Sequence, residues 1–240
     1  MSEFFKDALV DIASNIIWII ILTAGSCLLY LVKNGFKTLK LFIRLKKNGI
    51  ISFFPNRDSY TRDRPQSLEK YLETAEHSLL YVGHWLAVSI DQKNILDTFR
   101  NILLNKKTVT IVMLSDNLNP EIITKYANFF GRPAEDIKKQ IENCWAIIDE
   151  WRLKLGAEEQ KKLILKVHSE FIGHSAFLFD LGQKKSKALI DQKLWGLDRK
   201  NSYGIEFIAN QKIDAEENTL FFRYMNSIIK LNDHASDKNI

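Results

Sequence analysis

The fold is decided by residues 78–114, which read SLLYVGHWLAVSIDQKNILDTFRNILLNKKTVTIVML. The two ends of this stretch, SLLYVG (78–83) and TVTIVML (108–114), are apolar on both faces, a pattern typical of strands buried inside a sheet. Between them, residues 92–104 repeat apolar side chains at helical spacing, namely Ile95, Leu96, Phe99, Ile102 and Leu103. A strand, a helix and a strand in this order predict a parallel βαβ unit with a right-handed crossover.

On the N-terminal side of this unit, one more helix is expected. Ser67 is a suitable N-cap for a helix that runs to about Glu76. Residues 50–66 contain Pro55 and Pro65 among alternating charges, which indicates a connecting segment and no regular element.

On the C-terminal side, the pattern changes from helices to strands. Asn119-Pro120 begins a helical region, Gly131-Arg132-Pro133 interrupts it, and a long second helix ends at Gly156. A last helix is expected at about residues 217–231. Between these helices lie four short strands: LILKVHS (163–169), SAFLFDL (175–181), KALIDQ (187–192) and SYGIEFIA (202–209). We therefore expect an α/β fold with one mixed sheet flanked by helices.

The N-terminus carries a long apolar run. Residues 12–32, IASNIIWIIILTAGSCLLYLV, contain no charge and are about long enough to cross a hydrocarbon core of ~30 Å. The stretch before them carries Glu3, Lys6 and Asp11, which does not fit the positive start of a cleaved signal peptide. We therefore expect a transmembrane helix in an N-terminal anchor, residues 1–33.

The net charge of +5 is concentrated beside this run. Six basic residues lie there: Lys33, Lys37, Lys40, Arg44, Lys46 and Lys47. Subtracting them from 34 basic residues leaves 28, against 29 acidic ones. We therefore expect a basic stalk, residues 34–49, that contacts an anionic inner leaflet, with the N-terminus outside and the domain at the cytoplasmic face of the cell inner membrane. The remaining chain is nearly neutral, so no nucleic-acid partner is expected.

The remainder of the chain, roughly 190 residues, suits one domain. Apolar residues make up 46% and charged residues 26% of the chain, which argues against long disordered segments. We expect the domain at residues 50–231 and a frayed polar tail at residues 232–240. Cys27 and Cys144 form no metal signature, and HExxH and CxxC spacings are absent, so neither a metal nor another cofactor is expected. A homo-oligomer remains open.

The order of elements, together with four stretches of local sequence, resembles one copy of the phospholipase D-like, or HKD, superfamily. The stretches are SLLYVGHWLAVSI (78–90), TVTIVMLSD (108–116), KVHSEFIGHSAFLFD (166–180) and RKNSYGIEF (199–207). The resemblance covers residues 50–231. It implies a phosphodiesterase fold in which the histidine of an HxKxxxxD motif attacks phosphorus and the lysine steadies the phosphate charge.

The motif itself departs from this pattern. If Asp180 is the aspartate, Gly173 takes the histidine place and Ser175 the lysine place. His174 is then one residue out of step, which on a strand turns the side chain to the other face. Counting from His168 restores no lysine either. The superfamily site usually joins two motifs, whereas this chain offers a single degenerate one.

The resemblance and the residue types together give two sets of candidate site residues. Hydroxyl groups and cations at strand ends suit a phosphate, whereas a histidine after a buried strand is often a core residue and a loop cation is often solvated. The candidate catalytic residues are His174, His168 and Glu206. The candidate ligand-binding residues are His84, Ser175, Lys193, Arg199, Asn201 and Ser202.

The sequence thus favours a membrane-tethered, non-catalytic phospholipase D-like domain that binds a phosphate-bearing ligand or partner. One alternative is an active phosphodiesterase, a phospholipase or nuclease, that uses His168 or His174. Another is a membrane effector of a bacterial defence system, which rests on the architecture alone.

Overall fold

The computed structural model describes residues 35–56, 59, 66–86, 92–183, 185–197, 201–209 and 219–238. The chain divides into two compact units, Met1–Lys46 and Lys47–Ile240. In the first unit, the described residues belong to a helix over residues 35–47, along which every residue is exposed.

The predicted transmembrane helix is not supported. No helix within the described part of the chain is long and apolar enough to cross a membrane. Residues 35–47, the described part of a helix, carry five basic side chains: Lys37, Lys40, Arg44, Lys46 and Lys47. The fold class is therefore corrected to a mixed α/β domain on an eight-stranded sheet, and the transmembrane part of the expectation is unsupported. Residues 12–32, on which the expectation was based, lie outside the described residues.

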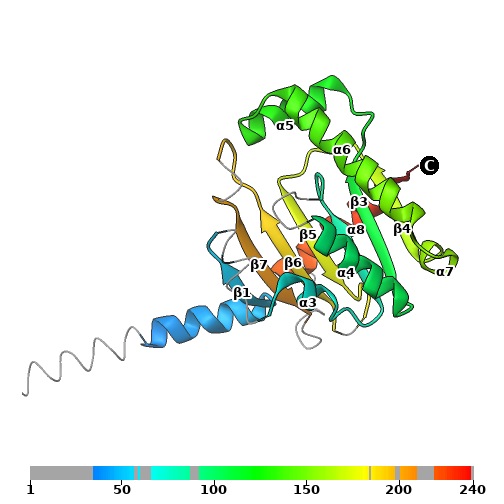
Figure 1. Cartoon of the computed structure of the whole chain (residues 1–240). Helices are drawn as coiled ribbons and strands as arrows, with labels where there is room; N and C mark the ends of the chain where they lie inside the picture. The colour runs from blue at the N-terminus through cyan, green and yellow to red at the C-terminus, as the bar shows by residue number, and fades with distance from the viewer. Residues whose placement is uncertain are drawn as a thin grey trace, which may run out of the picture. The chain divides into compact units, whose positions relative to one another are not determined.

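The second unit is built on one sheet of eight strands in the order β1-β7-β6-β5-β2-β3-β4-β8 (Figure 1). The pair β2–β3 is parallel, as the βαβ pattern predicted. The pair β3–β4 is also parallel, and the other pairs are antiparallel. The bounds are β1 Ile50–Phe54, β2 Ser78–Val82, β3 Thr108–Leu114, β4 Leu163–His168, β5 His174–Phe179, β6 Lys187–Gln192, β7 Tyr203–Ile208 and β8 Ser236–Asp237.

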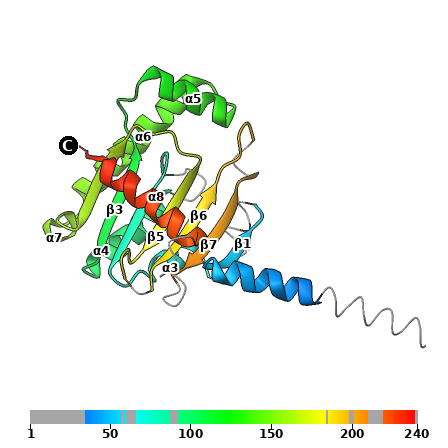
Figure 2. The same cartoon turned by 180° about the vertical axis from the view of Figure 1, so that it is seen from behind.

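Helices cover both faces of this sheet. One face carries α3 (Leu68–Leu72), α4 (Gln92–Leu104), α5 (Pro120–Phe130), α6 (Ala134–Leu153) and α7 (Ala157–Gln160) (Figure 1). The other face carries α8 (Leu220–His234), which crosses the strands obliquely (Figure 2). Each face has its own buried apolar cluster. Burial of apolar side chains on both faces explains why the central strands read as continuous apolar runs.

Local chemistry sets the break between α5 and α6. The Asn119 side chain accepts a hydrogen bond from the Glu121 backbone N–H at 2.9 Å and so caps the start of α5. Gly131 ends α5 in a left-handed conformation with φ 60°, which glycine adopts without steric cost. Pro133 then precedes the first residue of α6. The interruption expected from Gly131-Arg132-Pro133 is thus a helix end followed by a new start.

Two segments differ from the sequence-based expectation. Residues 50–54, expected as connecting chain, form β1 and pair with β7. The tail expected to fray, residues 232–240, starts within the last turn of α8, which ends at His234. Ser236–Asp237 then form β8 and pair with β4. Both are edge strands whose partners are distant in sequence, so no local pattern marks them.

Candidate functional site

Most of the predicted site residues lie at one edge of the sheet. Because β2, β3 and β4 are parallel, all three end there, and the antiparallel β5 begins there. His84 follows β2, His168 ends β4, His174 begins β5, and Lys193 follows β6. Ser202 and Asn201 immediately precede β7 at the same edge. The carboxyl ends of parallel strands are a common place for ligand sites in α/β folds. Arg199 lies outside the described residues.

Strand β5 divides these residues between the two faces of the sheet. The His174 ring meets the Tyr224 ring of α8, with ring centroids 6.1 Å apart and an interplanar angle of 87°. Ser175 points to the opposite face, like Phe177, which packs in the cluster under the other helices. The β5–β6 register runs without a shift from His174 to Phe179. Since no bulge occurs along this pairing, His174 cannot share a face with positions 173 and 175.

On the α8 face, His168 ends β4 and His174 begins β5, and the charge of His168 is one of those that act on His174. The Nε2 atom of His168 is 3.2 Å from the Gly83 carbonyl oxygen. Because a carbonyl only accepts, Nε2 carries the hydrogen and Nδ1 of the neutral ring is an acceptor. Two buried ring nitrogens, Nδ1 of His168 and Nε2 of His174, have no hydrogen-bond partner among the described residues. Buried polar atoms without partners are rare and point to an unmet interaction.

Burial sets the protonation of both rings. It lowers the pKa of His168, against smaller opposing effects of backbone hydrogen bonding to Gly83 and to Glu170 and of the negative charge of Glu170. Burial also lowers the pKa of His174, and the positive charges of His168 and Lys193 lower it further. Both rings are therefore neutral near pH 7, and a negatively charged ligand would favour their protonation.

On the opposite face, Lys193 forms a buried ion pair with Asp191. The lysine is 5% exposed, so it is not the solvated loop charge that was the alternative interpretation. Asp191 stands opposite Ser175 in the β5–β6 register. The charge of Lys193 is thus balanced by its own strand neighbour, which weakens its attraction for an anion.

The other predicted residues have structural surroundings. Nε2 of His84 is 2.7 Å from the Ile172 carbonyl oxygen, and its ring meets those of Tyr126 and Phe130 edge-on, as expected for a core histidine. Glu206 lies within β7 and accepts a hydrogen bond from the Tyr71 hydroxyl of α3. Of the two residues before β7, Ser202 is buried and Asn201 is exposed.

Asp180, the aspartate of the degenerate motif, lies at the opposite edge of the sheet from His174. Its carboxylate accepts hydrogen bonds from the backbone N–H groups of Glu76, His77 and Ser78 at 2.9, 2.6 and 3.0 Å. Burial by itself would raise the pKa of Asp180, but these three donors and the charge of His77 bring it below its usual range. Asp180 therefore fixes the start of β2 and takes no part in the histidine pair.

Sequence reasoning missed two residues of the site, Gly83 and Tyr224. A Cβ atom on Gly83 would lie 2.4 Å from the Tyr81 hydroxyl oxygen, so a larger residue would force a shift where the backbone accepts from His168. Tyr224 belongs to the apolar stripe of α8, together with Leu220, Phe221 and Ile228. Its place on that stripe was the signal that could have identified it. A tyrosine on the stripe faces the sheet, and here it contacts His174, the residue that begins β5.

Comparison with known proteins leaves the family open. No protein-family model matches the sequence, and no curated protein matches it. Among solved structures, the fold is similar to TrmBL2, an archaeal chromatin protein described as showing a novel mode of DNA binding. The identity is 11% and the TM-score 0.42, over 98% of this chain and 70% of that one.

A second similar structure is Nuc from Salmonella typhimurium, described as a phospholipase D family member. The identity is 12% and the TM-score 0.35, over 72% of this chain and 88% of that one. The chain therefore has a weak structural similarity to a phospholipase D family member. Both TM-scores lie below 0.5, and neither likeness assigns this chain a family or a ligand.

Proposed function

We propose that this domain binds a phosphate-bearing ligand at His168 and His174 without hydrolysing it, as a single phospholipase D-like copy with a degenerate motif. One observation carries the proposal. Two buried ring nitrogens, Nδ1 of His168 and Nε2 of His174, have no hydrogen-bond partner among the described residues. Leaving such an atom unpaired costs about 1–3 kcal/mol, and phosphate oxygens accept hydrogen bonds from protonated imidazoles. The His174 side chain is half-buried, and its Nε2 atom is buried.

Two features support binding without catalysis. A nucleophilic histidine of this kind requires a cation that steadies the same phosphorus centre. Ser175 occupies the lysine place of the motif and points to the other face. Lys193, the described lysine whose charge acts on His174, is itself paired with Asp191.

Binding is tested on the full chain by thermal unfolding in the presence of inorganic phosphate, AMP or glycerol 3-phosphate. A ligand that binds only the folded state raises the midpoint. We expect a rise with at least one of the three, its loss in His168→Gln and in His174→Gln, and its retention in His77→Gln. His77 is an exposed histidine at the opposite edge of the sheet and serves as the matched control. No rise with any of the compounds, or a rise that survives both substitutions, contradicts the proposal.

Catalysis is tested separately, with a nitrophenyl phosphodiester and with single-stranded DNA. We expect wild type, His168→Ala and His174→Ala to show the same background rate. Hydrolysis by wild type that either substitution removes would make the protein a phosphodiesterase and overturn the non-catalytic half of the proposal.

A further inference from the structure

The helical residues 35–47 form a surface that the histidine pair does not use. Every residue along them is exposed. Six large apolar side chains there are between 39% and 67% exposed: Phe36, Leu39, Leu41, Phe42, Ile43 and Leu45. A contiguous apolar surface in water marks a place of interaction. We propose that this helix lies flat on a bilayer that contains anionic lipid, with its apolar side in the boundary between headgroups and acyl chains.

The basic residues of this helix lie along one side of it. Four of them recur at steps of three, four and three positions, the spacing that keeps side chains on one helix face: Lys37, Lys40, Arg44 and Lys47. The rest of the circumference is apolar apart from Gly35, Thr38 and Lys46. The long stem of Lys46 can cross apolar surface and still place its charge among headgroups. A basic stripe opposite phenylalanine and leucine side chains is typical of helices that lie in the membrane interface.

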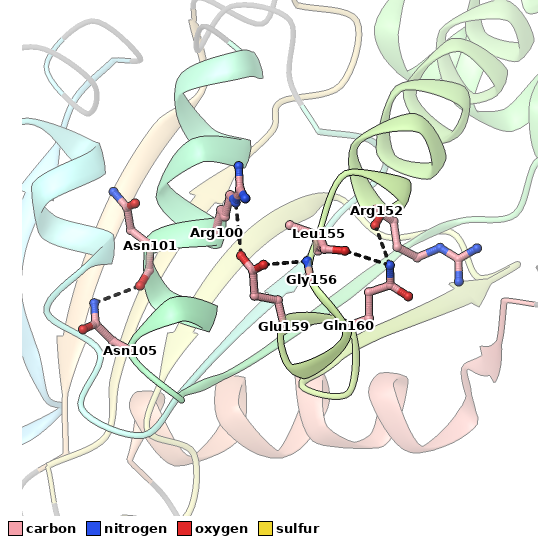
Figure 3. Close-up of polar contacts among 8 residues, drawn as sticks. All are labelled: Arg100, Asn101, Asn105, Arg152, Leu155, Gly156, Glu159 and Gln160. Atoms are coloured by element: carbon pink, nitrogen blue, oxygen red, sulfur yellow. Dashed lines mark hydrogen bonds and ion pairs between the residues drawn. The ribbon is translucent and has the colours of Figure 1, made fainter.

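The charge around this helix is of one sign. No aspartate or glutamate occurs in the sequence between Asp11 and Asp58. In the second unit, by contrast, basic residues lie beside acids: Arg100 pairs with Glu159 at 3.1 Å (Figure 3). A basic segment without nearby acids attracts anionic headgroups. Charge complementarity therefore favours an anionic bilayer as the partner of this helix.

The length of the helix decides how it meets the bilayer. At about 1.5 Å per residue, residues 35–47 extend roughly 20 Å. Salt screens exposed charges beyond about 8 Å under physiological conditions. A helix standing upright would therefore hold its far basic residues beyond the reach of the headgroups and would leave its apolar side in water. A flat helix brings the whole basic stripe to the headgroups and covers the apolar side.

The test compares neighbouring positions on the two sides of the helix in the full chain. Both native cysteines are first replaced, as Cys27→Ala and Cys144→Ala. Single cysteines are then introduced by Leu39→Cys or Ile43→Cys on the apolar side, and by Lys40→Cys or Arg44→Cys on the basic side. Each is labelled with nitrobenzoxadiazole, whose emission shifts to the blue in apolar surroundings. The labels report local depth, whatever else in the chain contacts the bilayer.

The labelled proteins are reconstituted with vesicles of phosphatidylcholine and phosphatidylserine, with and without bromine on the acyl chains. Labels at 39 and 43 should be blue-shifted and quenched by the brominated chains, whereas their neighbours at 40 and 44 should remain water-like. Equal quenching at all four positions would mean that lipid surrounds the helix, and no quenching that the helix stands in water. A blue shift at 39 and 43 without quenching would mean that protein covers the apolar side. Each of these three outcomes overturns the proposal.

The need for anionic lipid is tested in vesicles of phosphatidylcholine alone. Only the labels at 39 and 43 are used, because the other two variants each remove one basic residue. The ratio of lipid-contacting to water-exposed label should fall at least about fivefold, the factor that one basic residue near an anionic surface contributes. An unchanged ratio would overturn the proposal that anionic lipid is the partner.

Discussion

Asp180 shows how a motif residue can have a structural role at the scale of a single side chain. We predict that Asp180→Ala lowers the free energy of unfolding by about 2–4 kcal/mol, because three backbone donors lose a charged acceptor. Asp180→Asn should cost less, since an amide oxygen still accepts and Asn tolerates the left-handed backbone at φ 53°. Urea unfolding of the three proteins measures both values. Equal losses of stability in the two variants would show that the start of β2 is held by the negative charge of the carboxylate and not by its ability to accept hydrogen bonds.

The histidine pair should make stability depend on pH. Both rings have folded-state pKa values below the unfolded value of about 6.5. The unfolded chain therefore binds more protons below that pH, and the stability from keeping these rings neutral is full above about pH 6.5 and is lost as pH falls. We predict that His168→Gln/His174→Gln flattens the fall in urea midpoint between pH 7 and 5. Asp180 titrates at lower pH and leaves this window undisturbed. A fall of unchanged steepness would contradict the pKa directions.

Residue types at the site could be predicted from the sequence, but most of their partners could not. The alternation of β5 already placed His174 and Ser175 on different faces. The ion pair of Lys193 and Asp191 could also have been predicted from the sequence, because residues two positions apart at a strand end lie on the same face of the sheet. The hydrogen bond from Tyr71 to Glu206 joins elements far apart in the chain, so no local pattern contains it.

At the scale of elements, the sequence predicted the helices and strands that carry their own signals. The strands β2 to β7 have apolar runs, and α4 to α6 and α8 have apolar stripes, caps or glycine stops. The strands β1 and β8 have no such signal, because pairing with a distant partner creates them. Strand order was also beyond the sequence, since β5 pairs with β2 although two strands separate them in the chain.

The end of β2 gives a prediction at this scale. Gly83→Ala would place a methyl group 2.4 Å from the Tyr81 hydroxyl, whose hydrogen bond to the Trp85 carbonyl shapes the turn after the strand. We expect a loss of about 1–3 kcal/mol from overpacking. Gly131→Ala is the comparison, because nothing lies within 4 Å of its Cβ position and only the backbone at φ 60° is strained. Thermal unfolding should show the larger loss at Gly83. A larger loss at Gly131 would mean that the turn after β2 relaxes around the added methyl group, whereas the C-terminal end of α5 does not.

At the scale of the whole molecule, the strand order joins distant parts of the chain. The first strand, β1, pairs with the penultimate strand, β7, and the last strand, β8, pairs with β4. The centre of the sheet, β5-β2-β3, combines strands from both halves of the sequence. No single cut in the chain would therefore separate the sheet into two complete pieces, even though the parallel and antiparallel regions differ in architecture.

We therefore predict that Lys47–Ile240 unfolds in one cooperative step. The buried rings of Trp85 and Trp145 lie in the cluster under α4 to α6, whereas β6 and β7 belong to the antiparallel half. If β5 couples the halves, both must lose structure together, because opening the β2–β5 pairing exposes the apolar clusters on both faces. Tryptophan fluorescence and hydrogen exchange of β6 and β7, followed through the same urea series on the full chain, should give one midpoint.

Exchange of β6 and β7 at a lower urea concentration than the fluorescence change would show that the antiparallel half opens by itself. The histidine pair would then lie at the boundary between two separately stable halves, and ligand binding there would stabilise the weaker half first.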